Sequence, residues 1–166
     1  MLKPQDILVL LKLATGVPSW TFDSLGHELG LSASAVHRSL HRAEAAGLYD
    51  LRRRKIKPAA LFELLSHGIK YVFPPVWKGE TRGRRTAWAA LPLSRAIVPS
   101  GSPPVWPDVS GDAWGVALEP IHPSVPDAAR EDPKLSELLA LVDAIRIGTV
   151  RERVLAAEEL KKRLEA

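Results

Sequence analysis

Two histidines and two arginines lie within six residues of one predicted helix, and their types and spacing could serve three purposes. The stretch from Leu29 to Asp50 reads LGLSASAVHRSLHRAEAAGLYD and contains His37, Arg38, His41 and Arg42. Arginine can donate two parallel hydrogen bonds to guanine, and serine or histidine can bond to bases or phosphates. Histidines at positions i and i+4 can share a metal ion, and a basic helix face is also common as plain solvated surface.

A metal site is the weaker of these interpretations, because zinc needs ligands beyond two imidazoles. The chain contains no cysteine, and no carboxylate stands near His37 and His41 at the spacing of a zinc motif. We therefore expect neither a metal nor another cofactor.

The helix that carries these side chains is predicted over about residues 33–46. Ser32 can cap its start, and Gly47 can end it. Val36, Leu40 and Ala43 recur at the spacing of one inward face. The outward positions are Ser34, His37, Arg38, His41 and Arg42.

Two further helices are predicted before this one. Pro4 suits the first position of a helix with a broad apolar face, which Gly16 and Pro18 end. Thr21 can cap a second helix, with Phe22, Leu25 and Leu29 on its apolar side, and Gly30 allows the sharp turn that follows.

This arrangement resembles the helix-turn-helix of bacterial winged-helix transcriptional regulators, the MarR and IclR kinds in particular, over about residues 4–57. The most specific part is the Gly-Leu-Ser of residues 30–32, followed by Val-His-Arg at 36–38 and Glu-Ala-Ala-Gly-Leu at 44–48. Two positions depart from the pattern. Gly26 stands where alanine is usual, and Ser39 stands where many relatives have an aliphatic residue.

The resemblance implies a recognition helix in the major groove of double-stranded DNA, with a basic hairpin, the wing, over about residues 48–57. Leu48, Leu51 and Ile56 could face inward. No Asn-Gly or Asp-Gly turn is present, so the wing is expected to be short or irregular. We assign contacts with the DNA backbone to Arg52, Arg53, Arg54, Lys55 and Lys57.

The positive charge of the chain is concentrated where these contacts are predicted. Residues 37–57 hold seven lysines and arginines against two acidic residues, and residues 70–85 hold five against one. The formal net charge of the whole chain is only +4. A basic stretch that continues from a helix into a loop is typical of contact with phosphates.

Other classes of protein are disfavoured by what the sequence lacks. Without cysteine there are no disulfides and no cysteine nucleophile. The aliphatic run Ile7–Leu11 is far shorter than the roughly 20 residues of a membrane span. No hydrolase, metalloprotease or dinucleotide-binding motif is present. We expect a cytoplasmic protein that is not an enzyme and has no membrane partner.

The middle of the chain has a different composition, with ten of the fourteen prolines and four of the five tryptophans between Pro74 and Pro126. We predict short strands at Thr86–Leu91 and Ala113–Leu118, an ordered loop over residues 99–108, and an extended exit at Tyr71–Phe73. Pro58 is predicted to start a helix that reaches about Gly68.

The basic stretch Gly79–Arg85 has three interpretations. It could be a second nucleic-acid contact, a clamp for an anionic ligand, or an exposed basic turn. We favour the turn, because the pattern of a phosphate-binding loop is missing. The sequence does not assign a role to Arg82, Arg84 or Arg85.

Two amphipathic helices are predicted at the end of the chain. The first begins at Asp132-Pro133 and ends at Gly148, and a capping box of Thr149 and Glu152 begins the second. Because their apolar faces need a covering surface, and because helix-turn-helix proteins often bind two half-sites, we predict a homodimer through these helices.

The predicted fold class is α+β, mainly α. It comprises a winged helix-turn-helix domain over residues 1–73, a Pro/Trp-rich middle with short strands over 74–126, and a helical hairpin over 127–166. The predicted function is a sequence-specific DNA-binding regulator, a repressor. The alternative is an antitoxin-like or adaptor protein whose middle and C-terminal parts bind a protein partner.

Overall fold

The computed structural model describes all of residues 1–166 and confirms a mainly helical α+β protein, with 54% of the residues in helices and 14% in strands. The helices are α1 (Pro4–Ala14), α2 (Phe22–Leu29), α3 (Ala33–Ala45), α4 (Pro58–Glu63), α5 (Ile69–Val72), α6 (Val125–Arg130), α7 (Pro133–Ile147) and α8 (Val150–Glu165). The strands are β1 (Tyr49–Asp50), β2 (Lys55–Ile56), β3 (Trp77–Arg85), β4 (Pro104–Pro107) and β5 (Ala113–Leu118).

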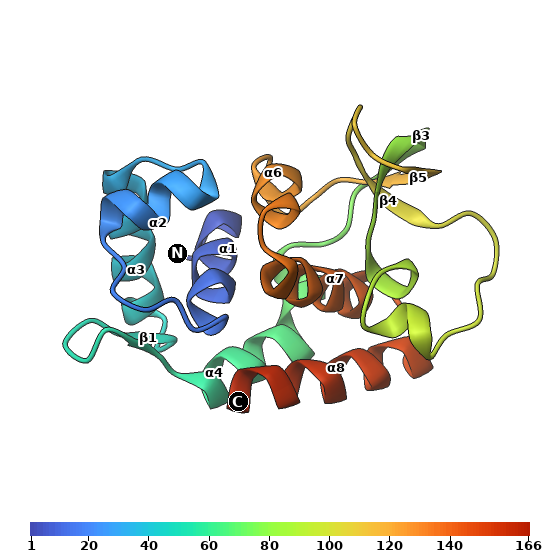
Figure 1. Cartoon of the computed structure of the whole chain (residues 1–166). Coiled ribbons are helices and arrows are strands. Elements are labelled where there is room, and N and C mark those ends of the chain that lie inside the picture. The colour runs from blue at the N-terminus through green and yellow to red at the C-terminus, as the bar shows by residue number, and fades with distance from the viewer.

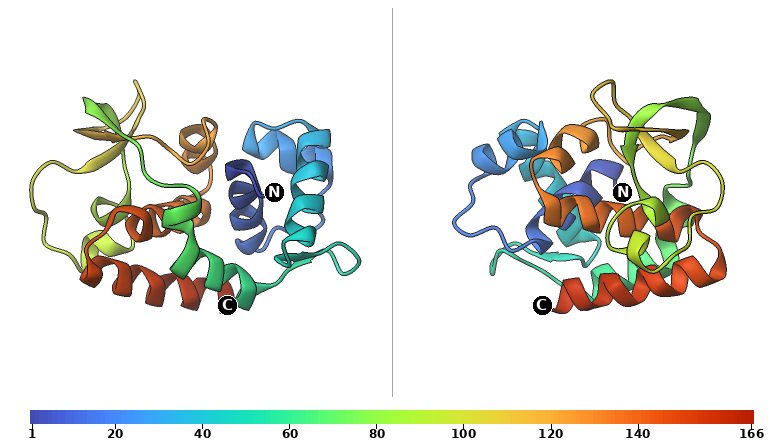
Figure 2. Two further views of the ribbon diagram at one scale, coloured as in Figure 1. Left: turned by 180° about the vertical axis from the view of Figure 1, so that it is seen from behind. Right: turned by 45° about the vertical axis from the view of Figure 1, so that its right-hand side comes forward.

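The first three helices form where the local signals predict them. Pro4 occupies the first turn of α1, and the Thr21 and Ser32 hydroxyls accept hydrogen bonds from the backbone N–H groups three residues on. Gly30 adopts the left-handed conformation, with φ of 69°, in the turn between α2 and α3. Residues 6–12 of α1 are buried, because the helix lies between α3 on one side and α7 on the other (Figures 1 and 2).

The turn between α2 and α3 explains the glycine at position 26. A Cβ atom there would lie 2.4 Å from the carbonyl oxygen of Leu31, whose own N–H donates to the carbonyl of Gly26 at 2.8 Å. Alanine at this position would force the turn open. The small loss of helix propensity at a glycine is therefore offset by a closer approach of the two helices.

The hairpin after α3 is short and irregular, as its missing turn motif predicts. Its strands β1 and β2 have two residues each, with Tyr49 opposite Ile56 and Asp50 opposite Lys55. The turn places Arg54 in the left-handed conformation, with φ of 55°. In both overall views the hairpin projects from the body of the protein (Figures 1 and 2).

The helix predicted from Pro58 continues past Gly68. Helix α4 passes into a π-helical stretch, Leu64–Gly68, and then into α5. The prediction of an extended segment at Tyr71–Phe73 is therefore wrong for its first two residues. A short run of apolar residues does not distinguish a strand from a buried helix. Here the segment is helical, and Ile69 of α5 is packed in the hydrophobic core.

The middle segment folds into a small closed barrel of three strands. Strand β3 pairs antiparallel with both β4 and β5, which pair with each other in parallel. The strand at Ala113–Leu118 is confirmed. Three predictions are wrong: Gly79–Arg85 lies in β3 instead of a turn, Thr86–Leu91 contains a 3₁₀ turn over Ala87–Ala89, and the predicted loop contains β4.

Glycines allow this barrel to be so narrow. A Cβ at Gly83 would lie 2.1 Å from the carbonyl oxygen of Trp106, and one at Gly115 would lie 2.0 Å from that of Pro103. These close approaches allow the polar strand β3 to pack tightly against the apolar strands β4 and β5.

The two C-terminal helices begin at their predicted caps. The Asp132 carboxylate accepts from the backbone N–H of Leu135, and Thr149 and Glu152 form a capping box. Helix α7 packs against α1, α5, α6 and α8, and α8 also contacts α4 along the base of the molecule (Figure 1). The hydrophobic core is one cluster of 32 residues drawn from all three parts of the chain.

A buried polar network fastens the barrel to α7. Asp143 accepts hydrogen bonds from the hydroxyl of Thr86 at 2.7 Å, the indole N–H of Trp106 at 2.8 Å and the guanidinium of Arg146 at 2.9 Å. Arg146 also donates to the carbonyl oxygen of Phe73. Burial raises the pKa of Asp143, because desolvation disfavours its charge, and the charge of Arg146 opposes that rise.

None of the helices combines the length and the apolar character that crossing a membrane requires.

Candidate nucleic-acid interface

The outer face of α3 is polar and exposed. Val36, Leu40 and Ala43 are buried, which turns Ser34, His37, Arg38 and His41 toward solvent. A guanidinium nitrogen of Arg38 donates to the Ser34 hydroxyl at 3.3 Å, and no carboxylate lies within 4.0 Å of Arg38. Its remaining donors are free to bond to a ligand.

The two histidines of α3 contact each other and the start of α2. Their Nε2 atoms are 3.1 Å apart, so one donates to the other. The edge of His37 meets the ring of Phe22, with centroids 5.2 Å apart, and Phe22 in turn packs against Trp20. Phe22 is 36% exposed, so the prediction that it lies on the buried side of α2 is wrong. No third acidic or histidine side chain joins the pair as a metal ligand.

Arg42 does not share this face. It makes a bidentate ion pair with Asp6 of α1, with its Nε 2.9 Å and its Nη2 2.7 Å from the two carboxylate oxygens. The Asp6 side chain is fully buried, and its Oδ2, which accepts from Nε of Arg42, also accepts from the N–H of Lys3. Hydrogen bonding to Asp6 raises the pKa of Arg42. The prediction that Arg42 points outward is corrected by this contact.

Ser39 belongs to the same contact. It is buried, and its hydroxyl accepts hydrogen bonds from Arg42 at 3.2 Å and from the side chain of Gln5 at 3.3 Å. An aliphatic residue at this position would leave those donors without an acceptor, which explains the second departure from the winged-helix pattern.

The basic residues of the hairpin differ in whether their side chains already have a partner in the protein. Arg53 pairs with Asp50 at 2.9 Å, and hydrogen bonds from Arg53 lower the pKa of that carboxyl group. Arg54 lies over the ring of Trp20, 4.0 Å from its centroid, and donates to the Trp20 carbonyl at 2.8 Å. Arg52, Lys55 and Lys57 are exposed, with no carboxylate within 4.0 Å.

These contacts join the hairpin to α3 in one surface. Trp20 touches Arg54 of the hairpin and Phe22, and Phe22 touches His37 of α3. At the first residue of the hairpin's turn, Glu44 of α3 accepts from the N–H of Leu51 at 3.0 Å. We call the exposed residues Ser34, His37, Arg38, His41, Arg52, Lys55 and Lys57 the basic face.

Comparison with models of protein families, with curated proteins and with solved structures gives no match for this chain.

The sequence alone did not identify three residues that position the basic face, namely Asp6, Glu44 and Trp20. Asp6 has the local signal of an acidic residue in the first turn of a helix, which predicts a cap and not a partner for Arg42. Glu44 and Trp20 carry no local signal, because their partners, Leu51 and Arg54, lie in the hairpin.

Proposed function

We propose that this chain binds double-stranded DNA through a winged helix-turn-helix formed by α1, α2, α3 and the hairpin, and that it regulates transcription as a repressor. The observation that carries the proposal is the continuity of the basic face. An exposed polar helix face and a basic hairpin are joined by the contacts of Trp20 and Phe22.

The dimensions of the proposed recognition helix suit the major groove. Thirteen residues give α3 a length of about 20 Å, and the groove is about 12 Å wide. Arg38 and Ser34 lie in its N-terminal half, where a recognition helix meets base edges. In this proposal Arg38 reads a guanine, while Arg52, Lys55 and Lys57 contact phosphates and set the register.

Arg42 has a different role in the proposal from the one predicted from the sequence. Because both of its carboxylate-facing nitrogens are occupied by Asp6, it holds α3 against α1 and does not read bases. The number of candidate base-reading arginines falls to one.

The homodimer through α7 and α8 stays a prediction. Few apolar side chains of these helices remain exposed for such an interface. The apolar faces of α7 and α8 are covered largely within the same chain. Val150 and Val154 of α8 are 68% and 52% exposed. A dimer through these helices would have to use that strip.

The test is selection of bound fragments from a random pool of duplex DNA, followed by affinity measurements at several salt concentrations. We expect an enriched sequence. Arg38→Ala should cost about 1–3 kcal/mol of discrimination at one base pair. Arg52→Ala should weaken binding to all sequences and reduce the salt slope by about one.

Arg95→Ala is the matched control, because Arg95 is an exposed arginine of the middle segment without an ion pair. This substitution should change neither the discrimination between base pairs nor the salt dependence of binding. An unenriched pool, or equal effects of Arg38→Ala and Arg95→Ala, would contradict the proposal.

A second function is favoured by one observation. Tyr71, Val72, Val76 and Trp77 are between 45% and 74% exposed, and such a run of large apolar side chains is typical of a protein-binding surface. Under an adaptor or antitoxin-like role, DNA would bind weakly and without preference. Replacing Tyr71 and Trp77 with serine would then abolish binding of the protein partner.

A further inference from the structure

A cleft of about 660 Å³ lies between the end of β3 and the start of α7. Its volume falls in the range of roughly 300–1,000 Å³ that is usual for small-molecule sites. Arg84 and Arg85 line one side, and Ala89, Ala90 and Leu91 form an apolar part of the wall. Ser94, Ser110 and Ser136 also line it. The basic stretch that the sequence left without a role thus ends in a cleft.

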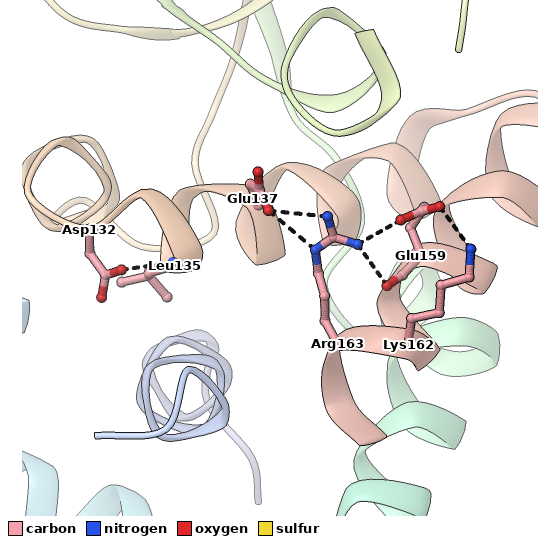
Figure 3. Close-up of polar contacts among 6 residues, drawn as sticks. All are labelled: Asp132, Leu135, Glu137, Glu159, Lys162 and Arg163. Carbon is pink, nitrogen blue, oxygen red and sulfur yellow. Dashed lines mark hydrogen bonds and ion pairs between the residues drawn. The ribbon is translucent and has the colours of Figure 1, made fainter. Parts of the chain in front are cut away.

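Three carboxylates line the cleft, those of Asp108, Asp112 and Glu137, and two of them, Asp108 and Glu137, are already engaged. Asp108 accepts from Arg130 at 2.8 Å and from the N–H and hydroxyl of Ser110. The bonds from Ser110, followed by that from Arg130, lower the pKa of Asp108 to about 2. Glu137 is held by Arg163 of α8 at 3.2 Å, and Figure 3 shows Arg163 between Glu137 and Glu159.

The guanidinium groups of Arg84 and Arg85, by contrast, have N–H donors that no protein group accepts. Arg84 is half-buried, has no carboxylate within 4.0 Å, and makes one long hydrogen bond, 3.4 Å, to the carbonyl of Ala129. Arg85 has its nearest carboxylate, Asp112, at 3.9 Å, and the Asp112 side chain is 83% exposed. A half-buried guanidinium without a counter-charge is costly, and a bound anion would remove that cost.

We propose that this cleft binds a small molecule that carries an anionic oxygen group, a carboxylate or a phosphate. Arg84 and Arg85 contact the anion, the hydroxyls of Ser94 and Ser136 bond to its polar groups, and Ala89, Ala90 and Leu91 cover its apolar part. This site is separate from the basic face, and the proposal does not depend on DNA binding.

The test is calorimetric titration of the whole protein in chloride buffer, with inorganic phosphate in one arm and citrate in the other. We expect saturable binding in at least one arm, and the stronger arm identifies the kind of anion. Arg84→Gln and Arg85→Gln should each weaken it by at least about tenfold, because a hydrogen bond to a charged group contributes that much. Arg84→Lys should lose less than Arg84→Gln.

Arg82→Gln is the matched control. Arg82 lies on the same strand with the same charge, but it is opposite Trp114 and outside the cleft. It should bind phosphate and citrate as the unchanged protein does. Absence of saturable binding in both arms, or an equal loss in Arg82→Gln, would overturn the proposal. Thermal unfolding of each variant checks the fold, and the exposed Arg85 carries the test if Arg84→Gln does not fold.

Discussion

At the scale of single residues, the ion pair of Arg42 and Asp6 determines how α3 is held. The carboxylate is buried, and three donors surround it: two guanidinium nitrogens and the N–H of Lys3. Burial makes this pair expensive to break, because a single partner left behind keeps its charge without compensation. Arg38, four residues earlier, is exposed and has no such partner.

This difference predicts unequal costs for two similar substitutions. Arg42→Gln should lower the free energy of unfolding by about 3–5 kcal/mol, because Asp6 stays buried without its cation. Arg38→Gln should change it by no more than about 0.5 kcal/mol. Urea unfolding followed by circular dichroism measures both. Similar midpoints for the two variants would show that the Asp6 contact does not stabilise the fold.

At the scale of elements, the hairpin depends on contacts outside itself. Two residues per strand are too few to hold a hairpin alone. Its turn is fixed at one end by the contact of Glu44 with Leu51 and at the other by the contact of Arg54 with Trp20. The loop between α1 and α2 therefore sets the position of the hairpin relative to α3.

Trp20→Ala should loosen the hairpin, because it removes the ring beneath Arg54 and leaves the carbonyl in place. Trypsin cleavage after Arg52, Arg53 or Arg54 should become about two- to fivefold faster, which corresponds to a cation–π contact of about 0.5–1 kcal/mol. Mass spectrometry of the fragments gives the rate. Trp114→Ala removes an exposed tryptophan of β5 and serves as the control. An equal rate in both variants would argue against this contact.

At the scale of the whole molecule, one hydrophobic cluster joins the three parts of the chain, and Asp143 adds hydrogen bonds between them. This residue of α7 binds Thr86 just after β3 and Trp106 of β4, and its partner Arg146 binds the segment after α5. The barrel is therefore attached to α7 by hydrogen bonds as well as by packing.

Asp143→Asn should lower the free energy of unfolding by about 3–5 kcal/mol, because Arg146 would stay buried without a counter-charge. Denaturant unfolding measures the change. Lys162→Ala, which breaks an exposed ion pair with Glu159, should cost no more than about 1 kcal/mol. If both variants unfold at the same denaturant concentration, the buried network is not what attaches the barrel.

The sequence by itself determined the features whose causes lie within a few residues. The caps at Thr21, Ser32, Asp132 and Thr149 each bind a backbone N–H three residues on, so composition and spacing were enough to place the starts of four helices. The same holds for the left-handed turn at Gly30 and for the outward positions of Ser34, His37, Arg38 and His41.

Only the tertiary structure decided which charges are free. Arg42 and Asp6 are 36 residues apart, and the partner of Arg54 is 34 residues away, so no local pattern distinguishes them from Arg38 and Arg52. The strand at Gly79–Arg85 was missed because its polar, glycine-rich sequence forms a strand only where β4 and β5 approach it closely. Pairing energy between distant segments depends on the whole fold, and a one-dimensional pattern does not contain it.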